Sequence, residues 1–585
     1  MDTTIARPEY PRPDFTREGW QSLNGTWDFC FDDEDRIEAG GDFAAFPAAT
    51  KITVPFCYQS AMSGIGSSEV HPVLWYRRTF DVDMADGRVL LHFGAVDYLA
   101  KVWLNGVFLG SHAGGHSGFH FDVTAQVREQ GNELIVKAED YEERDKPRGK
   151  QTWTGEKFGC WYTATSGIWQ PVWLEYAGSA YFTQIKITPD VERLQALCEV
   201  FLSSPRPLRV RAVASFSIDG RKQEMTAETL VEDGYGQLVF AFPDHDIRQH
   251  YILWSPEEPN LIDVCCETLD LPVNDRVQTY FGMRQIEVIN GRIWLNGANL
   301  FQRLVLDQGY WKESLLTPPS DKAIIADIRL TKEMGFNGVR KHQKIEDPRY
   351  YYWADRMGLL VWGEMPSAYC YNDNAVTRSA DELAAFIRRD YNHPCIVAWV
   401  TINESWGVRQ IVTSRQQQDY AKALYYLAKA LDPTRLVSSN DGWEQLNDTD
   451  ICAIHDYALF ADNVDKYDDF DDFLTHAALH RPLYAQGHAH RGQPVLMTEY
   501  GGIAFEDKDE TSWGYFGKVK TEEEFLARLG PVTAYLVQSG RFCGFCYTQL
   551  TDVMQETNGL LTAEREVKVD LQKLKALIDS GKTNK

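Results

Sequence analysis

Residues 396–404 read IVAWVTINE, an apolar stretch that ends in an amide and a carboxylate. Helical periodicity precedes this stretch at Asp381–Tyr391 and follows it at Gln416–Leu431. A continuous apolar strand between two helices is typical of a parallel sheet that helices cover on both faces. We therefore expect a buried strand that presents Asn403 and Glu404 at its carboxyl end.

The same alternation of strands and helices continues on both sides of this stretch, from residue 284 to residue 585. The other predicted strands are Asn299–Leu306, Gly338–His342, Leu359–Gly363, Leu436–Ser439, Ile451–His455, Val495–Glu499 and Gly544–Gln549. The other predicted helices are Ala323–Met334, Pro348–Met357 and Glu523–Gln538. Eight such units in about 300 residues predict a (β/α)8 TIM barrel.

The residues before the barrel predict two β-domains. Residues 1–178 contain short strands separated by turns, and Asn105-Gly106 between two apolar runs is a strong hairpin signal. This pattern favours a jelly-roll β-sandwich. Residues 179–283 have strands spaced as in a smaller sandwich, for which we expect an immunoglobulin-like architecture.

Composition narrows the function classes. The chain has 585 residues, which favours two to four domains, and a formal net charge of −25. Such an acidic chain repels nucleic acids and anionic membranes, so we expect neither as a partner. No stretch is long and apolar enough for a transmembrane helix. The sequence is compatible with a homo-oligomer.

Cysteine usage and the first residues predict a cytoplasmic protein. The 11 cysteines are scattered and odd in number, which is typical of reduced thiols. Residues 1–15 contain no apolar run, so we expect no secretory signal. The motif Cys543-Gly544-Phe545-Cys546 lies in a predicted strand and has no second pair at zinc-site spacing.

Polar residues gather where the predicted strands end, which is where TIM barrels place their chemistry. Glu404 ends the fourth strand and Glu499 the seventh, across the barrel mouth from each other. Two carboxyls directed into one pocket are the arrangement that glycoside hydrolysis requires, and a retaining enzyme holds them about 5–5.5 Å apart. The alternative is that both are structural acids paired with arginine or lysine.

Physical chemistry also assigns different charge states to the two carboxyls. A general acid must hold its proton near neutral pH, so we expect a raised pKa for Glu404. A nucleophile must be ionised, as we expect of Glu499. Its negative charge would help to keep the acid protonated.

Several motifs together resemble glycoside hydrolase family 2, the family of β-galactosidases and β-glucuronidases. These motifs cover nearly the whole chain in order: Leu23-Asn24-Gly25-Thr26-Trp27, Ser166-Gly167-Ile168-Trp169, Gly335-Phe336-Asn337-Gly338-Val339-Arg340, Asn392-His393-Pro394, Asn403-Glu404-Ser405-Trp406-Gly407 and Thr498-Glu499-Tyr500-Gly501-Gly502. The resemblance implies Glu404 as general acid/base, Glu499 as nucleophile and a covalent glycosyl-enzyme.

Further roles follow from the resemblance alone. It implies that Asn403 binds the sugar 2-hydroxyl, that Tyr457 hydrogen-bonds the nucleophile, and that Arg340 and His342 lie at the pocket floor. The remaining candidates for substrate binding are Asp307, Trp362, Trp406, His455 and Tyr547. For the charged and aromatic candidates, burial in the core or in structural ion pairs is the alternative. We expect no cofactor and no metal ligands.

The substrate rim departs from the family pattern. Residues 555–561 read QETNGLL, without the Asn-x-Lys loop by which β-glucuronidases bind a carboxylate, and Tyr547 stands where many members have tryptophan. We therefore expect an exo-acting enzyme on β-galactosides or a related sugar such as α-L-arabinopyranose. The alternatives are a β-glucuronidase, a β-mannosidase, or a carbohydrate-binding protein that has lost catalysis.

Overall fold

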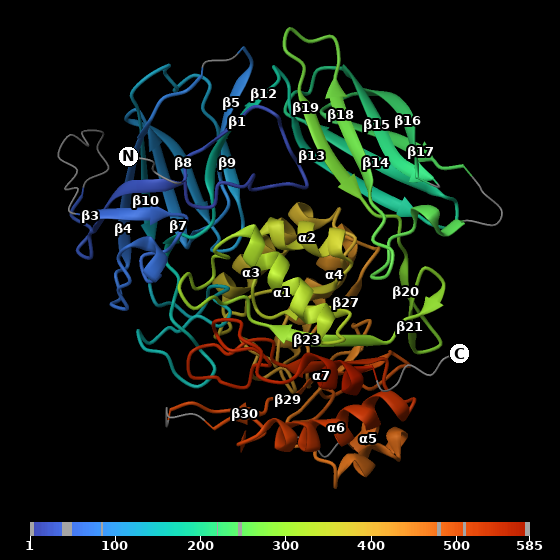
Figure 1. Cartoon of the computed structure of the whole chain (residues 1–585). Helices are drawn as coiled ribbons and strands as arrows, with labels where there is room; N and C mark the ends of the chain where they lie inside the picture. The colour runs from blue at the N-terminus through green and yellow to red at the C-terminus, as the bar shows by residue number, and fades with distance from the viewer. Residues whose placement is uncertain are drawn as a thin grey trace.

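The computed structural model describes residues 5–37, 50–83, 86–218, 220–243, 249–476, 481–506 and 511–579. It contains two β-sandwiches beside a barrel of strands and helices (Figure 1). Each of the three units has its own large hydrophobic core. This matches the predicted architecture of a jelly-roll sandwich, an immunoglobulin-like sandwich and a TIM barrel. Separate cores are expected, since one core rarely organises a chain of this length.

The N-terminal sandwich packs a six-stranded antiparallel sheet, in the order β3-β2-β4-β10-β7-β8, against a four-stranded sheet, β1-β12-β5-β9. Its strands are β1 Trp20–Ser22, β2 Gly25–Phe31, β3 Thr50–Val54, β4 Val73–Phe80, β5 Arg88–Phe93, β6 Val96–Asp97, β7 Leu99–Leu104, β8 Val107–Ala113, β9 Phe119–Asp122, β10 Asn132–Glu139, β11 Gly167–Ile168 and β12 Val172–Ala177. The predicted hairpin at Asn105-Gly106 is confirmed. It joins β7 to β8, and both turn residues have positive φ, as a type I′ turn requires.

The second sandwich contains a three-stranded sheet, β13-β14-β17, and a four-stranded sheet, β16-β15-β18-β19. Its strands are β13 Phe182–Asp190, β14 Gln195–Leu202, β15 Leu208–Ile218, β16 Arg221–Val231, β17 Tyr235–Ala241, β18 Ile262–Thr268 and β19 Arg276–Phe281. Buried and exposed residues alternate along β14, β15 and β17, so each strand places one face in the core. A small sheet of β20 Ile286–Ile289, β21 Arg292–Leu295 and β22 Ala298–Asn299 precedes the barrel.

The barrel consists of eight parallel strands in the order β27-β26-β25-β24-β23-β32-β29-β28. These strands are β23 Gln302–Asp307, β24 Gly338–Lys341, β25 Leu360–Glu364, β26 Ile396–Val400, β27 Leu436–Ser438, β28 Cys452–Asp456, β29 Val495–Gly501 and β32 Gly544–Thr548. All eight predicted strands are present. Seven of them, all except β23, are buried at every residue, which explains why most read as apolar runs.

The helices in the described part of this half are α1 Asp321–Glu333, α2 Pro348–Met357, α3 Asp373–Asp390, α4 Arg415–Leu431, α5 Phe470–His476, α6 Glu522–Gln538 and α7 Leu571–Ile578. Helix α3 begins eight residues before its predicted start, because the side chain of Asn372 caps the backbone N–H of Ala375. Helices α5 and α7 were not predicted, and they have only seven and eight residues. A further short pair, β30 Ala504–Phe505 and β31 Lys518–Val519, lies between β29 and α6.

Buried polar contacts hold the three units together. The Arg17 guanidinium binds Glu175 of the first sandwich and Asp275 of the second, and both ion pairs are buried. Tyr280 of β19 donates to Asp355 of α2 at 2.8 Å. Separating such a buried pair would leave an uncompensated charge, which is strongly unfavourable. These contacts therefore fix the sandwiches relative to the barrel.

One loop of the first sandwich reaches the barrel mouth. The backbone N–H groups of Arg148 and Gly149 donate to the carbonyl of Ser367, at 3.0 and 3.1 Å. Gly149 has a φ of +61°, and a Cβ there would lie 2.1 Å from the carbonyl oxygen of Gln343. Only glycine permits this approach, and the next residue, Lys150, is thereby placed over the ends of the barrel strands.

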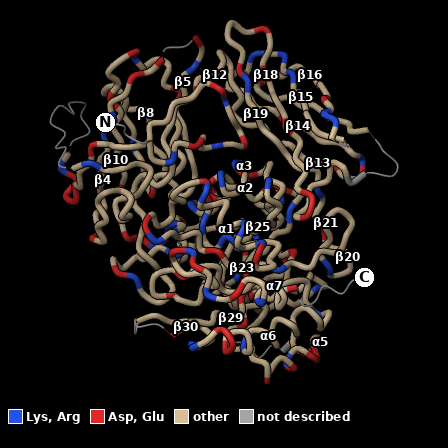
Figure 2. The backbone as a smooth tube through the Cα atoms, viewed as in Figure 1, with Lys and Arg blue, Asp and Glu red and all other residues tan. Residues whose placement is uncertain are grey.

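Acidic and basic residues are distributed over all three units (Figure 2). Among the described residues, no helix is both long and apolar enough to span a bilayer.

Candidate active site

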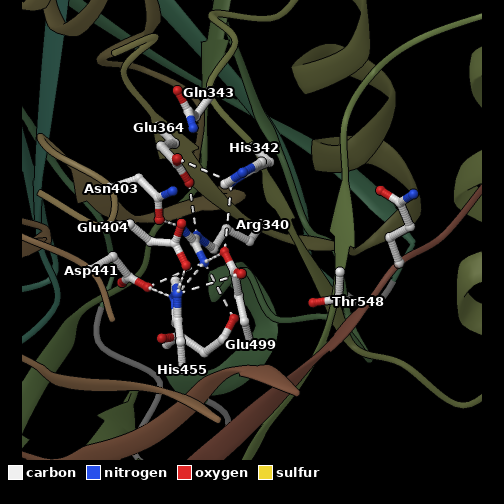
Figure 3. Close-up of polar contacts among 12 residues, drawn as sticks. Arg340, His342, Gln343, Glu364, Asn403, Glu404, Asp441, His455, Glu499 and Thr548 are labelled. Carbon is white, nitrogen blue, oxygen red and sulfur yellow. Dashed lines mark hydrogen bonds and ion pairs between the residues drawn. The ribbon is translucent and has the colours of Figure 1, made fainter. Parts of the chain in front are cut away.

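The site lies at the carboxyl ends of the barrel strands, and Figure 3 shows most of its polar side chains converging there. Glu499 belongs to β29, whereas Glu404 follows β26 after a short extension. Glu404 and Ser405 both have positive φ, at +52° and +56°. The backbone N–H of Glu404 is held by the carbonyl of Asp441 at 2.9 Å. Such backbone strain in residues with side chains is typical of functional sites.

The two predicted catalytic carboxylates meet. One carboxylate oxygen of Glu404, one of Glu499 and a ring nitrogen of His455 all lie within 4.8 Å of one another. This spacing is close to that of a retaining glycosidase and leaves no room for a water molecule between acid and nucleophile. Apolar packing does not separate the two side chains.

Glu499 is held by two donors. The Arg340 guanidinium binds Oε1 at 2.9 Å, and the Tyr457 hydroxyl donates to Oε2 at 2.6 Å. Tyr457 is itself fixed by stacking on Tyr515, with ring centroids 3.9 Å apart. Tyr457 is therefore where it was predicted, and Arg340, which was expected at the pocket floor, is a second partner; together they fix the orientation of the carboxylate.

Arg340 organises the pocket floor. Its side chain is fully buried and also binds Glu364 at 2.8 Å and Asn403 Oδ1 at 2.6 Å. Burial opposes its charge, but Asp441, Glu364 and Glu499 together raise the pKa of Arg340 well above its usual value. Since Asn403 accepts from Arg340 through its oxygen, the Nδ2 group remains able to donate to a substrate hydroxyl.

The expectation of a raised pKa for Glu404 is wrong for the substrate-free protein. Burial does favour the protonated form, but His455 Nδ1 lies 2.9 Å from Oε1, and its hydrogen bond and charge outweigh that effect. With smaller contributions from Lys150 and His342, the pKa of Glu404 falls to about 2. The free protein therefore holds Glu404 as a carboxylate.

His342 and Glu364 lie beside each other at the edge of the pocket. The ring Nδ1 of His342 lies 3.2 Å from Glu364 Oε1 and 4.0 Å from Glu499 Oε1. Burial, with Lys150 and Arg340 nearby, lowers the pKa of His342 well below its usual value. Burial also raises the pKa of Glu364 to about 7, although Arg340 opposes the shift.

Trp406, unlike the predicted Trp362, lies at the site beside Glu404. Its indole N–H points to Glu404 Oε2 at 3.3 Å, and its ring packs edge-on against Trp161 of the N-terminal domain, with centroids 5.1 Å apart. The pair forms an aromatic wall beside the acid, where a sugar ring or an aryl leaving group could pack.

Three predicted substrate-binding residues are not brought to the carboxylates. Asp307 turns away from the pocket and pairs with Lys341 at 2.8 Å. Trp362 is buried in the core, where its indole donates to Gln302 at 2.7 Å. Tyr547 lies on the outer face of β32, where its ring packs against Tyr500 and Phe525. These residues stabilise the barrel and do not line the site.

The neighbours of two of these residues lie nearer the site, because side chains alternate along a strand. Thr548 Oγ1 lies 3.1 Å from the Tyr457 hydroxyl, and Gln308 donates to Gln549 at 3.0 Å. Thr548 also appears in Figure 3. The predictions of Asp307 and Tyr547 were each one residue away from an inward-facing position.

Lys150 was missed altogether. Lys150 is only 7% exposed, and it forms no ion pair with the described residues. Burial opposes its charge, but Cys160, Glu556, Tyr369 and Glu404 raise the pKa of Lys150. No sequence signal pointed to it, since it lies in a loop of the N-terminal domain, far along the chain from the barrel strands.

The absence of metal ligands stays a prediction. Glu404, His455 and Glu499 are the only group of three metal-ligating side chains found together among the described residues. Arg340 already supplies positive charge to Glu499, so this group has its counter-ion from the protein itself.

Comparison with protein families gives matches to both ends of the chain. Residues 286–582 match the TIM barrel domain of glycosyl hydrolases family 2, and residues 20–172 match the sugar binding domain of the same family. The barrel match alone covers more than half of the chain.

Individual relatives differ in the sugar named for them. The chain is 24% identical to a β-glucuronidase of Paenibacillus borealis, over 97% of this chain and 98% of that protein. It is 25% identical to a β-galactosidase of Thermoanaerobacter pseudethanolicus, over 84% of this chain and 66% of the relative. The chain spans only 46% of the length of another curated relative.

Solved structures share the fold. A β-galacturonidase of Eisenbergiella tayi, bound to galacturonate, superposes with a TM-score of 0.74 at 20% identity, covering 98% of this chain and 99% of that one. With both domain matches in order along the chain, and two glutamates facing each other over the barrel mouth, the protein belongs to glycosyl hydrolases family 2.

Proposed function

We propose that the chain is a retaining exo-β-glycosidase, with Glu499 as nucleophile and Glu404 as general acid/base, acting on β-galactoside-type sugars. The observation that supports this most directly is the approach of the two carboxylates, whose facing oxygens lie within 4.8 Å. An inverting enzyme needs a wider gap to admit water.

The geometry suits a double displacement. Arg340 and Tyr457 hold Glu499 with its carboxylate beside the position of the anomeric carbon, and Glu404 lies on the side where the leaving oxygen would depart. Attack by Glu499 forms a glycosyl ester while Glu404 protonates the leaving group. Glu404 then removes a proton from water, which cleaves the ester with retention. Asn403 would bind the 2-hydroxyl during both steps.

The test is a panel of nitrophenyl glycosides that differ only in the sugar. We expect burst release of nitrophenol with the preferred sugar and no burst after Glu499→Gln. A glycosyl adduct on wild-type protein, found by mass spectrometry with a 2-fluoro sugar, would locate the nucleophile. Binding of sugar without turnover in wild-type protein would show a carbohydrate-binding protein instead. An adduct on any residue other than Glu499 would refute the assignment.

A β-uronide is the second candidate substrate, and Lys150 is the observation that favours it. A buried ammonium without an ion-pair partner among the described residues, near Glu404, would favour an anionic substituent on the bound sugar. The names of the Paenibacillus borealis and Eisenbergiella tayi relatives agree with this reading. The missing Asn-x-Lys loop would then be replaced by a cation from another domain.

The substitution Lys150→Met distinguishes between the two candidate substrates, β-galactosides and β-uronides. If the substrate is a uronide, the substitution lowers kcat/KM for nitrophenyl β-uronides and spares β-galactosides. Lys157→Met is the matched control, because Lys157 is exposed in the same loop. Equal losses on both sugars would exclude a role for Lys150 in reading the sugar carboxylate.

We also propose a cytoplasmic location. All 11 cysteines are free in the structure, as is typical of a reducing compartment.

A further inference from the structure

His455 occupies the space between the two catalytic carboxylates. Its Nδ1 lies 2.9 Å from Glu404 Oε1 and 3.4 Å from Glu499 Oε2, while its Nε2 lies 2.9 Å from Asp441 Oδ1. The ring side chain is fully buried (Figure 3). When both carboxyl groups are ionised, a ring that faces their oxygens with both nitrogens can satisfy both contacts only as an imidazolium, because a neutral ring has one donor.

The surrounding charges agree with a protonated ring. Three carboxylates face it, from the ends of β26 and β27 and from β29, whereas Arg340 of β24 is the one cation in contact among the residues that the structure describes. The Arg340 NH1 group lies 2.9 Å from Glu499, 3.2 Å from Asp441 and 3.3 Å from His455 Nε2. NH1 donates to Glu499, and Nε2 lies closer to Asp441 Oδ1, at 2.9 Å, than to NH1, so Nε2 donates to Asp441.

The other groups packed around the ring do not compete for its proton. Trp443 lies edge-on, with ring centroids 5.5 Å apart, and Tyr457 on the same strand is occupied by Glu499. Gly442 closes the remaining side: a Cβ there would lie 2.7 Å from His455 Nδ1. Lys150 and His342 act on Glu404 from farther away, and Glu364 acts through Arg340.

We propose that His455 stores the proton that Glu404 delivers to the leaving group, and that His455 releases this proton when Glu499 loses its negative charge by forming the ester. The proposal rests on the assignment of Glu404 and Glu499 made above. His455 does not touch the reacting atoms, so it acts as a positioning residue through Glu404.

The proton and electron pairs balance over the cycle. When Glu499 attacks, its lone pair forms the ester bond, and the electron pair of the broken glycosidic bond goes to the leaving oxygen. That oxygen takes a proton from Glu404, which takes the Nδ1 proton of His455. In the second half, water attacks, the ester bond breaks and Glu499 regains its charge. The water proton passes to Glu404 and back to Nδ1, so one water is consumed and no redox step occurs.

The electrostatics couple the two events. Burial opposes protonation of His455, but Glu499 is the strongest group that favours it, followed by Asp441 and Glu404, and the pKa of His455 rises to about 9. Converting Glu499 to a neutral ester removes that leading contribution. The proton is therefore held while the nucleophile is charged and given up as the ester forms.

Nitrogen NMR of 15N-histidine-labelled protein tests the proposal on the wild-type chain. At pH 7, we expect His455 to show two protonated ring nitrogens in the free protein. We expect a neutral ring once Glu499 is trapped with a 2-deoxy-2-fluoro glycoside. The signal is assigned with His455→Gln. The same charge state before and after trapping would overturn the proposal. Failure of mass spectrometry to find any adduct would instead overturn the assignment of the nucleophile, on which the proposal rests.

The pH dependence of kcat/KM supplies a second test that a purely structural histidine would not satisfy. In wild-type protein, the shared proton is lost only at alkaline pH. In His455→Gln it must reside on Glu404 alone, so we expect the basic limb to move down by at least one pH unit, with about tenfold loss of rate per pH unit above it. His120→Gln is the control, because His120 is exposed on β9 of the first sandwich and contacts neither carboxylate, so it should leave the limb where it is. An unmoved limb in His455→Gln would overturn the proposal.

Discussion

Replacing Glu404 by alanine should remove acid catalysis while leaving the nucleophile intact. The two Glu404 oxygens face His455 at 2.9 Å and Trp406 at 3.3 Å, and neither contacts Arg340 or Tyr457, the two donors that hold Glu499. Glu499 should therefore keep its orientation. Loss of a general acid costs about 10²–10⁴-fold, which corresponds to roughly 3–5 kcal/mol of activation free energy.

The loss should depend on the leaving group. A dinitrophenolate departs without protonation, so its glycosylation step should be nearly unchanged, whereas a methyl or alkyl glycoside should show the full loss. Deglycosylation then becomes slow, because no base activates water, and the glycosyl-enzyme accumulates. Azide needs no base and fits where the carboxylate has been removed, within 4.8 Å of the Glu499 oxygen.

The assay is turnover of an aryl glycoside by Glu404→Ala with and without azide, with the anomeric configuration of the product read by NMR. We expect acceleration by azide and a β-glycosyl azide. Glu404→Gln is the matched control, because the amide fills the same space and should admit no azide. An α-azide, or acceleration of the glutamine variant alone, would refute the reasoning.

Three other substitutions test separate parts of the structure. Tyr457→Phe removes the 2.6 Å hydrogen bond to Glu499, worth about 1.5–3 kcal/mol for a charged acceptor, so kcat/KM should fall by roughly 10- to 100-fold; an unchanged value would mean that Tyr457 does not orient the nucleophile. Asp307→Asn should lower the free energy of unfolding by about 1.5–3 kcal/mol in urea titrations, because Lys341 loses one of its two buried carboxylate partners and keeps Glu346, while the activity of the folded protein stays as it is. Lys341 lowers the pKa of Asp307, although burial opposes the shift; the stability from this pair is therefore present above about pH 4 and is lost as pH falls below it, where wild type and variant should converge. Tyr547→Phe loses only a 3.3 Å bond to the carbonyl of Asn558, so we expect about 0.5–1.5 kcal/mol of lost stability and no change in the preferred sugar; a changed preference would place Tyr547 in the site after all.

Much of the barrel and of its polar rim could be predicted, because both follow from local patterns. A buried parallel strand reads as an apolar run, and the residue that ends it faces the mouth. That rule led to Glu404 and Glu499, and the family resemblance added Arg340 and Tyr457; the four side chains meet in the structure.

The same rule failed by one residue where the exact end of a strand mattered. Asp307 and Tyr547 each precede a residue that lies nearer the site, and side chains alternate along a strand, so a shift of one position reverses the face. Trp362 has the right face but lies too deep, against Gln302 in the barrel core.

Two properties had no local signal. Lys150 lies 254 positions before Glu404 in the chain, on another domain, and only the fold places it near the acid. The ionised state of Glu404 depends on His455, 51 positions away, so the sequence could give the role of the acid but not its resting charge.

The close fit of Gly149 against the barrel has a consequence for how this protein could diversify. The chemistry depends on strands of one domain, but the loop over its mouth is supplied by another. Changes in that loop can alter which glycosides are accepted without disturbing the reacting groups, so selectivity and reactivity can change independently. A barrel separated from the first sandwich would keep both glutamates but would lose the loop that covers its mouth.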